Sequence, residues 1–158
     1  MRKIVLSCCL LFVCSVSAFA QKSAPPSGQF GVGIYQSASA LPSGVTLDYA
    51  MNHNLDLGTY LGLLVQSGGG TATTFGLAPY IRYSFHSTVS PFIQGGIAVI
   101  GGGGTSTFGI FMGPGLAYYL DSHFGVHAEF DFLGIAFTDP MGVGFGWGST
   151  RIGLQWFL

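Results

Sequence analysis

Charged side chains near the C-terminal end of the sequence have the types and spacing that acid–base chemistry could use. His127 and Glu129 stand two residues apart, so an extended chain places an imidazole and a carboxylate on one face. A hydrolase would also need a nucleophile within reach of that pair. The surrounding segment 124–134 contains no serine. We therefore expect no enzyme, and we interpret His127 as a hydrogen-bonded interior residue.

The sequence gives little support for a cofactor or metal site. The glycine run at 101–104 lacks the lysine that a phosphate-binding loop requires. All three cysteines precede residue 15, inside a predicted export signal, so no cysteine remains downstream for a metal site or a disulfide. His53, His86 and His123 fall in predicted turns, where we interpret them as solvated residues. We expect no cofactor and no metal.

Two pairs of opposite charges are spaced to meet across hairpins. The first pair is Asp56 with Arg82, and the second is Glu129 with Arg151. Opposite charges on cross-strand neighbours stabilise strand pairing, and a buried charge needs a partner. We interpret both pairs as structural elements that fill and rigidify a narrow interior. The alternative is a gate or a path for protons or ions.

Several further polar residues share the face that carries these charges. Asp48 and Asp131 gain no basic partner from the spacing, so we expect them to be hydrated or bonded to a tyrosine hydroxyl. Gln94 and Gln155 lie on the same face, as does His127. Together with the charge pairs they are the predicted interior polar residues.

Alternation of apolar and polar residues predicts the elements that position these side chains. The last eight residues turn Ile152, Leu154, Trp156 and Leu158 to one side, because a strand has a side-chain period of two. The eight predicted strands are 29–36, 44–52, 55–66, 73–85, 91–100, 107–120, 124–134 and 145–158. Each of them is long enough to cross a membrane as a tilted strand, which needs about 9–11 residues, although the first is only marginally so.

The composition decides which face of these strands points outward. The chain is 49% hydrophobic and 7% charged, whereas soluble domains carry about 25% charged residues. A soluble barrel would need many charges outside, yet Lys22 is the single lysine after residue 20. Only helices and closed barrels satisfy the backbone within a bilayer. The apolar run of the export signal is too short for a spanning helix, and no run of about 20 apolar residues follows it. The apolar face therefore points to lipid.

The N-terminus has the layout of an export signal. Arg2 and Lys3 precede a short apolar run, and Ala18-Phe19-Ala20 is a small-x-small cleavage site. We expect a cleaved signal peptide over 1–20, a flexible leader over 21–28 and a barrel domain over 29–158. The absence of a basic patch argues against nucleic acid as a partner.

Turns and aromatic residues indicate an orientation in the membrane. Short polar turns at 52–54, 86–90 and 121–123 alternate with longer connections at 37–43, 67–72, 101–106 and 135–144. Membrane barrels have short periplasmic turns and longer outer loops. We predict that one aromatic girdle lies at the short-turn end, formed by Tyr49, Tyr83, Phe85, Tyr118, Phe124 and Trp156.

In its ordered series of features, the chain resembles the small OmpA/OmpX-like outer-membrane β-barrel family. The features are the export signal, the eight ribbons, Gly-Pro-Gly at 113–115, Ser90-Pro91-Phe92 at a strand opening and the aromatic terminal strand. The match covers about residues 28–158. Family members usually end in Phe, whereas this chain ends in Phe157-Leu158. The resemblance implies insertion by the outer-membrane assembly machinery through the C-terminal strand.

We conclude from the sequence that the fold is all-β, an eight-stranded antiparallel up-and-down transmembrane β-barrel in a Gram-negative outer membrane. The predicted role is structural: a monomeric envelope protein whose lumen is mostly filled by side chains, with the lipid bilayer as its partner. One alternative is a narrow, porin-like channel for water, ions or very small solutes. Another is a barrel that handles lipid or hydrophobic ligands through Leu64, Phe92, Ile100 and Phe111.

Overall fold

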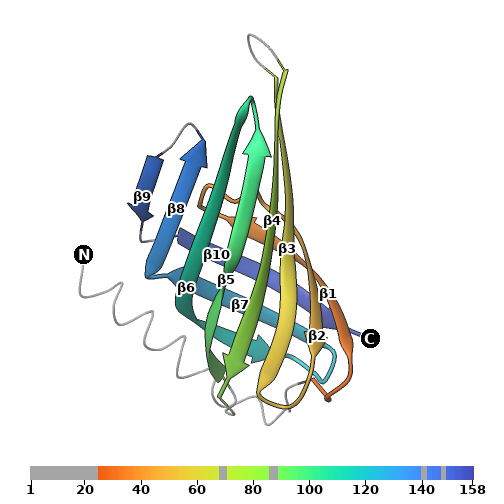
Figure 1. Cartoon of the computed structure of the whole chain (residues 1–158). Helices are drawn as coiled ribbons and strands as arrows, with labels where there is room; N and C mark the ends of the chain where they lie inside the picture. Colours follow the sequence, from red (N-terminus) through yellow and green to blue (C-terminus); the bar gives the residue numbers. More distant parts are fainter. Residues whose placement is uncertain (1–24, 68–70, 86–88, 140–141, 147–148) are drawn as a thin grey trace, which may run out of the picture.

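The chain forms one antiparallel sheet that closes on itself (Figure 1). The computed structural model describes residues 25–67, 71–85, 89–139, 142–146 and 149–158. The predicted signal peptide and the first half of the predicted leader lie outside these residues. No helix among the described residues is long and apolar enough to cross a membrane. The strands are β1 (Phe30–Ser37), β2 (Gly44–Ala50), β3 (Leu55–Ser67), β4 (Thr71–Ser84), β5 (Val89–Gly102), β6 (Thr105–Tyr119), β7 (Phe124–Asp131), β8 (Leu133–Asp139), β9 (Gly142–Gly146) and β10 (Ser149–Phe157).

These strand segments build an eight-stranded barrel, as the alternation predicts. β7 and β8 follow one another along β6, and β9 and β10 follow one another along β8 and β7. β5 pairs with both β4 and β6, and β1 pairs with β10, where Val32 stands opposite Trp156. Every strand of the ring therefore has two neighbours, which removes the exposed edges of an open sheet.

A β-bulge separates β7 from β8. Gly115 stands opposite Glu129, but Met112 stands opposite Leu133, so two residues of β6 face three on the other strand. Phe132 and Leu133 are consecutive and both exposed. A bulge of this kind inserts one residue and shifts the alternation. After it, even-numbered residues of β8 take the inward position that odd-numbered residues hold in β7.

The structure corrects three of the predicted outer loops. Segment 135–144 is largely a β8–β9 hairpin, because β6 continues far enough to give β8 a hydrogen-bonding partner. Strand β3 reaches Ser67 and β4 begins at Thr71, so the strands take up half of 67–72, and β5 and β6 run through most of 101–106. Between β5 and β6 only Gly103 and Gly104 remain, both with positive φ as a tight hairpin turn requires.

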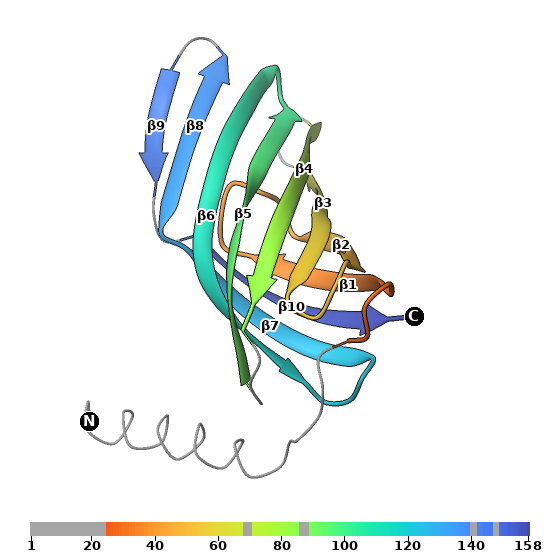
Figure 2. The same ribbon diagram turned by 60° about the horizontal axis from the view of Figure 1, so that its bottom comes forward.

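The β8–β9 hairpin rises beyond the closed ring (Figure 2). Among the described residues β9 pairs with β8 alone. β1 ends at Ser37, opposite Arg151 of β10. Strands β3 to β6 continue above that level, and the β8–β9 hairpin continues alongside β6. Between β1 and β2 the chain there is the 38–43 connection.

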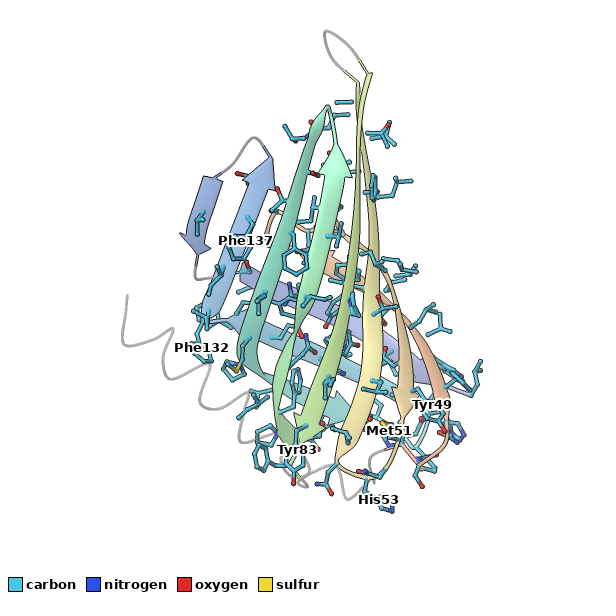
Figure 3. All side chains as sticks on the ribbon, in the orientation of Figure 1. Tyr49, Met51, His53, Tyr83, Phe132 and Phe137 are labelled. Carbon is cyan, nitrogen blue, oxygen red and sulfur yellow. The ribbon has the colours of Figure 1, made fainter. Side chains whose placement is uncertain are left out.

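The two faces of the sheet differ as the sequence predicts: charges point inward and large apolar side chains point outward. Within β1, exposed and buried residues alternate almost perfectly. On the outside, side chains such as Phe30, Ile81 and Ile152 are more than half exposed. Figure 3 shows such side chains around the whole barrel, with Tyr49 and Tyr83 near the short-turn end and Phe137 toward the other end.

Candidate functional site: the polar interior of the barrel

All the predicted interior polar residues are buried inside the barrel. They come from six different strands, because inward positions alternate along each one. The most exposed of them, Asp56 and Asp131, are only 6% exposed. The set is Asp48, Asp56, Arg82, Gln94, His127, Glu129, Asp131, Arg151 and Gln155.

Arg151 joins the two carboxylates of β7. It stands opposite Glu129 in the β7–β10 ladder, and its Nε donates to Glu129 Oε1. Its Nη2 donates to both carboxylate oxygens of Asp131, at 2.6 and 2.7 Å. The guanidinium also lies over the rings of Tyr60 and Phe111, at 5.0 and 4.9 Å from their centroids. One cation thus pairs with two acidic groups and stacks on two aromatic rings.

Tyr60 of β3 links this group to the far wall. Its hydroxyl donates to Glu129 Oε2 at 2.9 Å. The Tyr60 hydroxyl oxygen in turn accepts from Gln94 Nε2 at 3.2 Å and from Arg82 Nη2 at 3.4 Å. Tyr60 is completely buried. Its hydroxyl is therefore the point where the hydrogen bonds of the two arginines meet.

Arg82 does not form the predicted ion pair. Asp56 stands opposite it in the β3–β4 ladder, yet no ion pair joins the two side chains in the described structure. The long side chain of Arg82 instead reaches over the ring of Phe92, 4.5 Å from the centroid, and its Nε donates to Gln94 at 3.1 Å. Cross-strand pairing brings the Cβ atoms of Asp56 and Arg82 together. The guanidinium at the end of the long Arg82 side chain can still reach past Asp56 to other partners.

Asp48 is held by Tyr80, whose hydroxyl donates to its Oδ1. The sequence left Asp48 with a tyrosine as one possible partner, and Tyr80 takes that position. Gly58 of β3 stands opposite Asp48 of β2 on one side and opposite Tyr80 of β4 on the other. A Cβ at Gly58 would overlap both of these side chains. We call the resulting set the interior network: Asp48, Tyr60, Tyr80, Arg82, Gln94, Glu129, Asp131 and Arg151.

His127 differs from its predicted role. It is 3% exposed and packs over Gly153, where a Cβ would lie 2.4 Å from its Cε1. Neither ring nitrogen has a hydrogen-bond partner among the described residues. Both oxygens of Glu129 are engaged by Arg151 and Tyr60. The sequence spacing that suggested an acid–base pair therefore does not produce one.

An apolar cluster closes the short-turn end of the interior. Phe92 and Phe157 are 1% and 0% exposed, and Tyr119 packs 6.4 Å from the Phe157 ring centroid. We call this the turn-side cluster: Ala50, Phe92, Ala117, Tyr119 and Phe157. An eight-stranded barrel has room for little besides side chains, and these bulky groups occupy that room.

The first outer connection folds into the opposite mouth. Leu41 is 4% exposed and packs with Tyr35, Tyr60 and Phe111. The Tyr35 hydroxyl donates to the Pro42 carbonyl at 2.5 Å. The sequence showed 37–43 as a loop but gave no signal that Leu41 would turn inward, since a single Leu in a polar loop fits either direction.

The predicted aromatic girdle residues all point outward near the short-turn end. Phe124 and Trp156 pair with ring centroids 5.9 Å apart, and Tyr83 and Phe85 pair at 5.3 Å. Tyr49 packs against Phe30 at 4.8 Å, and Tyr118 stands opposite Val89 and Val126. The nearby turns are closed by acceptor side chains: Asn52 accepts from two backbone amides, and so does Asp121.

The four residues that the sequence suggested for hydrophobic ligands do not share a cavity. Phe92 belongs to the turn-side cluster, whereas Phe111 packs at the opposite mouth with Ile100 beside it. Leu64 is 44% exposed because β3 extends past the ring at this level. Of the four, Ile100 and Phe111 alone line the same pocket.

No family model and no curated protein sequence matches the chain. Among solved structures, the N-terminal β-barrel domain of Pseudomonas aeruginosa OprF is similar, with a TM-score of 0.60, 14% identity and coverage of 84% of this chain and 98% of that one. The Escherichia coli outer membrane protein W matches with a TM-score of 0.46, 12% identity and coverage of 84% and 99%. The similarity to the OprF domain confirms the predicted fold, an eight-stranded antiparallel barrel.

Proposed function

We propose that this chain is an integral outer-membrane protein with a structural role in the envelope and a lumen closed by its own side chains. The observation that carries the proposal is the interior network, which runs from Asp131 of β7 to Asp48 of β2 through hydrogen bonds and ion pairs. The turn-side cluster adds a second, apolar closure below it. A solute would have to break both to pass.

The outer surface supports placement in lipid. Large apolar side chains are exposed around the ring, including Val32, Leu63 and Ile97 at 47%, 64% and 44%. Soluble monomers rarely expose contiguous apolar patches of more than a few hundred Å². The outward aromatic residues at the short-turn end support an orientation with those turns in the periplasm.

Assembly and oligomeric state follow from the same architecture. The exposed face of β10 carries Ile152, Leu154 and Trp156, as a closing strand recognised by the assembly machinery would. The ring has no open edge that requires a partner chain, which favours a monomer. We propose that the chain is not an enzyme, because both carboxylate oxygens of Glu129, the best candidate acid, already accept hydrogen bonds from Arg151 and Tyr60.

A narrow channel is the second candidate, and a specific observation favours it. Several buried polar atoms have no hydrogen-bond partner among the described residues, including Arg82 Nη1 and both ring nitrogens of His127. Buried polar groups are normally satisfied by protein or water. A thin file of water beside the interior network would satisfy them.

Single-channel conductance separates the two candidates. The full chain, expressed with its own export segment, is fractionated, purified from the membrane and inserted in planar bilayers after a heat-dependent gel shift confirms folding. We expect recovery in the outer-membrane fraction and no steady conductance, with conductance appearing in an Arg151→Ala/Tyr60→Ala variant. Steady wild-type conductance that changes in Arg82→Glu would instead establish the channel. Val143→Leu, on an outward position, is the matched control.

A further inference from the structure

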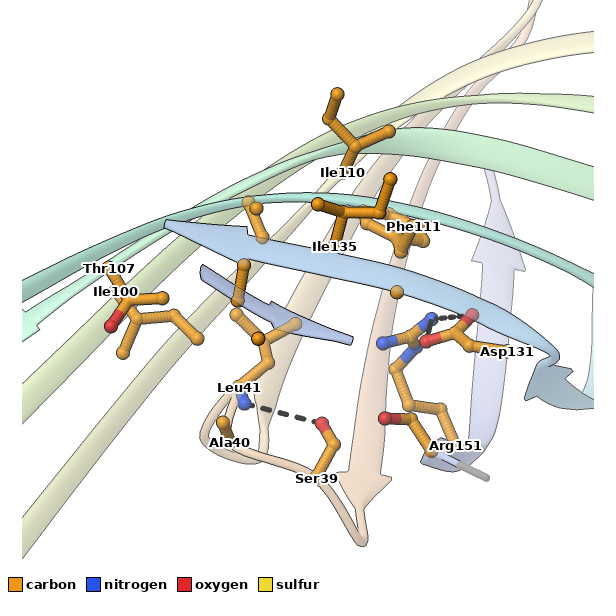
Figure 4. A pocket seen from close by; sticks show the side chains of 16 residues that line it. Ser39, Ala40, Leu41, Ile100, Thr107, Ile110, Phe111, Asp131, Ile135 and Arg151 are labelled. Atoms are coloured by element: carbon orange, nitrogen blue, oxygen red, sulfur yellow. Dashed lines mark hydrogen bonds and ion pairs between the residues drawn. The ribbon is translucent and has the colours of Figure 1, made fainter. Parts of the chain in front are cut away.

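We propose that the outer mouth of the barrel holds a binding site for a small amphiphile with a cationic end, such as an alkylammonium group. The site is a pocket of about 300 Å³ between the 38–41 segment, β5–β6 and the β8–β9 hairpin (Figure 4). Its size is at the lower end of the roughly 300–1,000 Å³ of ligand pockets. We call it the mouth pocket. Asp131 and Arg151 of the interior network form its inner end, and its other lining residues lie outside that network.

The walls of the mouth pocket are mostly apolar. Leu41 and Ala40 come from the first connection, Ile100 from β5 and Phe111 from β6. In Figure 4, Ile100 and Thr107 lie at one end of the pocket and the Arg151–Asp131 pair lies at the other. A ligand that fits this layout has an apolar body and one polar tip.

Small residues on three adjacent strands create the space. Gly109 of β6 stands opposite Ala136 of β8, which stands opposite Gly144 of β9, and all three line the pocket. A Cβ built at Gly144 meets no atom within 4 Å, so this position faces open volume. A larger side chain there would fill the pocket without displacing the backbone.

The charge at the polar end selects the sign of the ligand. Asp131 and Arg151 both line the pocket and pair with each other, and Arg151 also pairs with Glu129. One guanidinium thus faces two carboxylates, and the group carries a net negative charge when all three are ionised. Glu129 lies below the pocket and is further held by Tyr60. The carboxylate that lines the pocket is that of Asp131, and both of its oxygens accept from Arg151 Nη2. An ammonium group therefore complements the net charge of the whole group.

Binding of hexylammonium tests the site, with hexanoate as a probe of equal chain length and opposite charge. Titration calorimetry uses the full barrel in lipid nanodiscs, with empty nanodiscs subtracted. We expect saturable binding of one hexylammonium per chain and at least about tenfold weaker binding of hexanoate, a difference of about 1.4 kcal/mol. Equal or tighter binding of hexanoate, or no saturable hexylammonium binding by folded protein, would overturn the proposal.

Variants locate the binding in the mouth pocket. Gly144→Leu should weaken hexylammonium binding at least about tenfold, whereas Val143→Leu, on the opposite face of β9, should leave it unchanged. Asp131→Asn should weaken it similarly, and Asp56→Asn, outside the pocket, should not. Folding of each variant is checked by the heat-dependent gel shift. If Gly144→Leu binds hexylammonium like the wild type, the site is not in this pocket. That result would leave the proposed closed lumen untouched, because the conductance experiment tests the lumen separately.

Discussion

Tyr60 and Glu129 meet across the full width of the barrel, with 2.9 Å between the Tyr60 hydroxyl and Glu129 Oε2. Their strands, β3 and β7, are separated around the ring by β2, β1 and β10. A hydrogen bond between opposite walls exists only because the interior is narrow. It ties the Arg151 group to the Arg82 group and makes the interior network continuous.

Tyr60→Phe tests the importance of this link. The variant leaves Glu129 Oε2 and Gln94 with one fewer partner in a buried site, which costs about 1–3 kcal/mol. We expect the urea midpoint of the folded barrel in lipid vesicles to fall while the overall fold stays intact. Tyr83→Phe is the control, because Tyr83 is 48% exposed on the outer face. Equal stability of Tyr60→Phe and wild type would mean that the cross-barrel bond contributes nothing.

Removing the cation has a larger effect than removing the whole charged group. Arg151→Met leaves Glu129 and Asp131 buried without their partner, and breaking a buried pair from one side costs about 3–5 kcal/mol. We expect the triple variant Arg151→Met/Glu129→Gln/Asp131→Asn to recover much of that loss, because no uncompensated charge remains.

Unfolding of both variants in urea measures this difference. Parallel spectra in the far ultraviolet confirm that each variant starts from a barrel. A triple variant less stable than Arg151→Met would contradict the argument, since it would mean that the two carboxylates left without Arg151 do not destabilise the fold.

Much of the fold was predictable because each strand buries one face. The charges of Asp56, Arg82, Glu129 and Arg151 fall on inward positions, and the hairpin centres set the correct registers for both ladders. The β8–β9 hairpin was not predictable, because its residues are glycine-rich and flank Pro140. Its strands form because β6 extends far enough to pair with β8.

The side-chain geometry of the interior was less predictable than the register. Sequence spacing identifies cross-strand neighbours but not contacts across the barrel, so it missed the role of Tyr60. It also assigned Arg82 to Asp56, whereas the guanidinium reaches Gln94 and the Phe92 ring. Long side chains choose among several partners in three dimensions, and a one-dimensional pattern does not rank them.

A charge on the outer belt tests whether the barrel lies in lipid. Ile97 is 44% exposed, stands opposite Ile110 and lies midway along β5. On a lipid-facing strand, Ile97→Arg should cost about 2–4 kcal/mol at the bilayer midplane and about 0–1 near an interface. Val143→Arg, on the hairpin beyond the ring, should cost little. Unfolding from lipid vesicles measures both, and an unaffected Ile97→Arg would argue for an outer face in water.

Gly76→Val tests whether the 38–43 connection is held in the mouth. A Cβ at Gly76 would lie 2.5 Å from Leu41 Cδ1, closer than real contacts allow, and 3.0 Å from Pro42 Cδ, which is a tight contact. The substitution should expel Leu41, break the Tyr35–Pro42 hydrogen bond and lower stability by about 1–3 kcal/mol through overpacking. Proteinase K should then cut the 38–43 connection of the folded variant, whereas the folded wild type should resist cleavage there. Gly144→Ala is the control, because its Cβ meets nothing within 4 Å. The same cleavage pattern in Gly76→Val and wild type would mean that the 38–43 connection stays in the mouth despite the clash. The space at Gly76 would then not be what holds Leu41 in place.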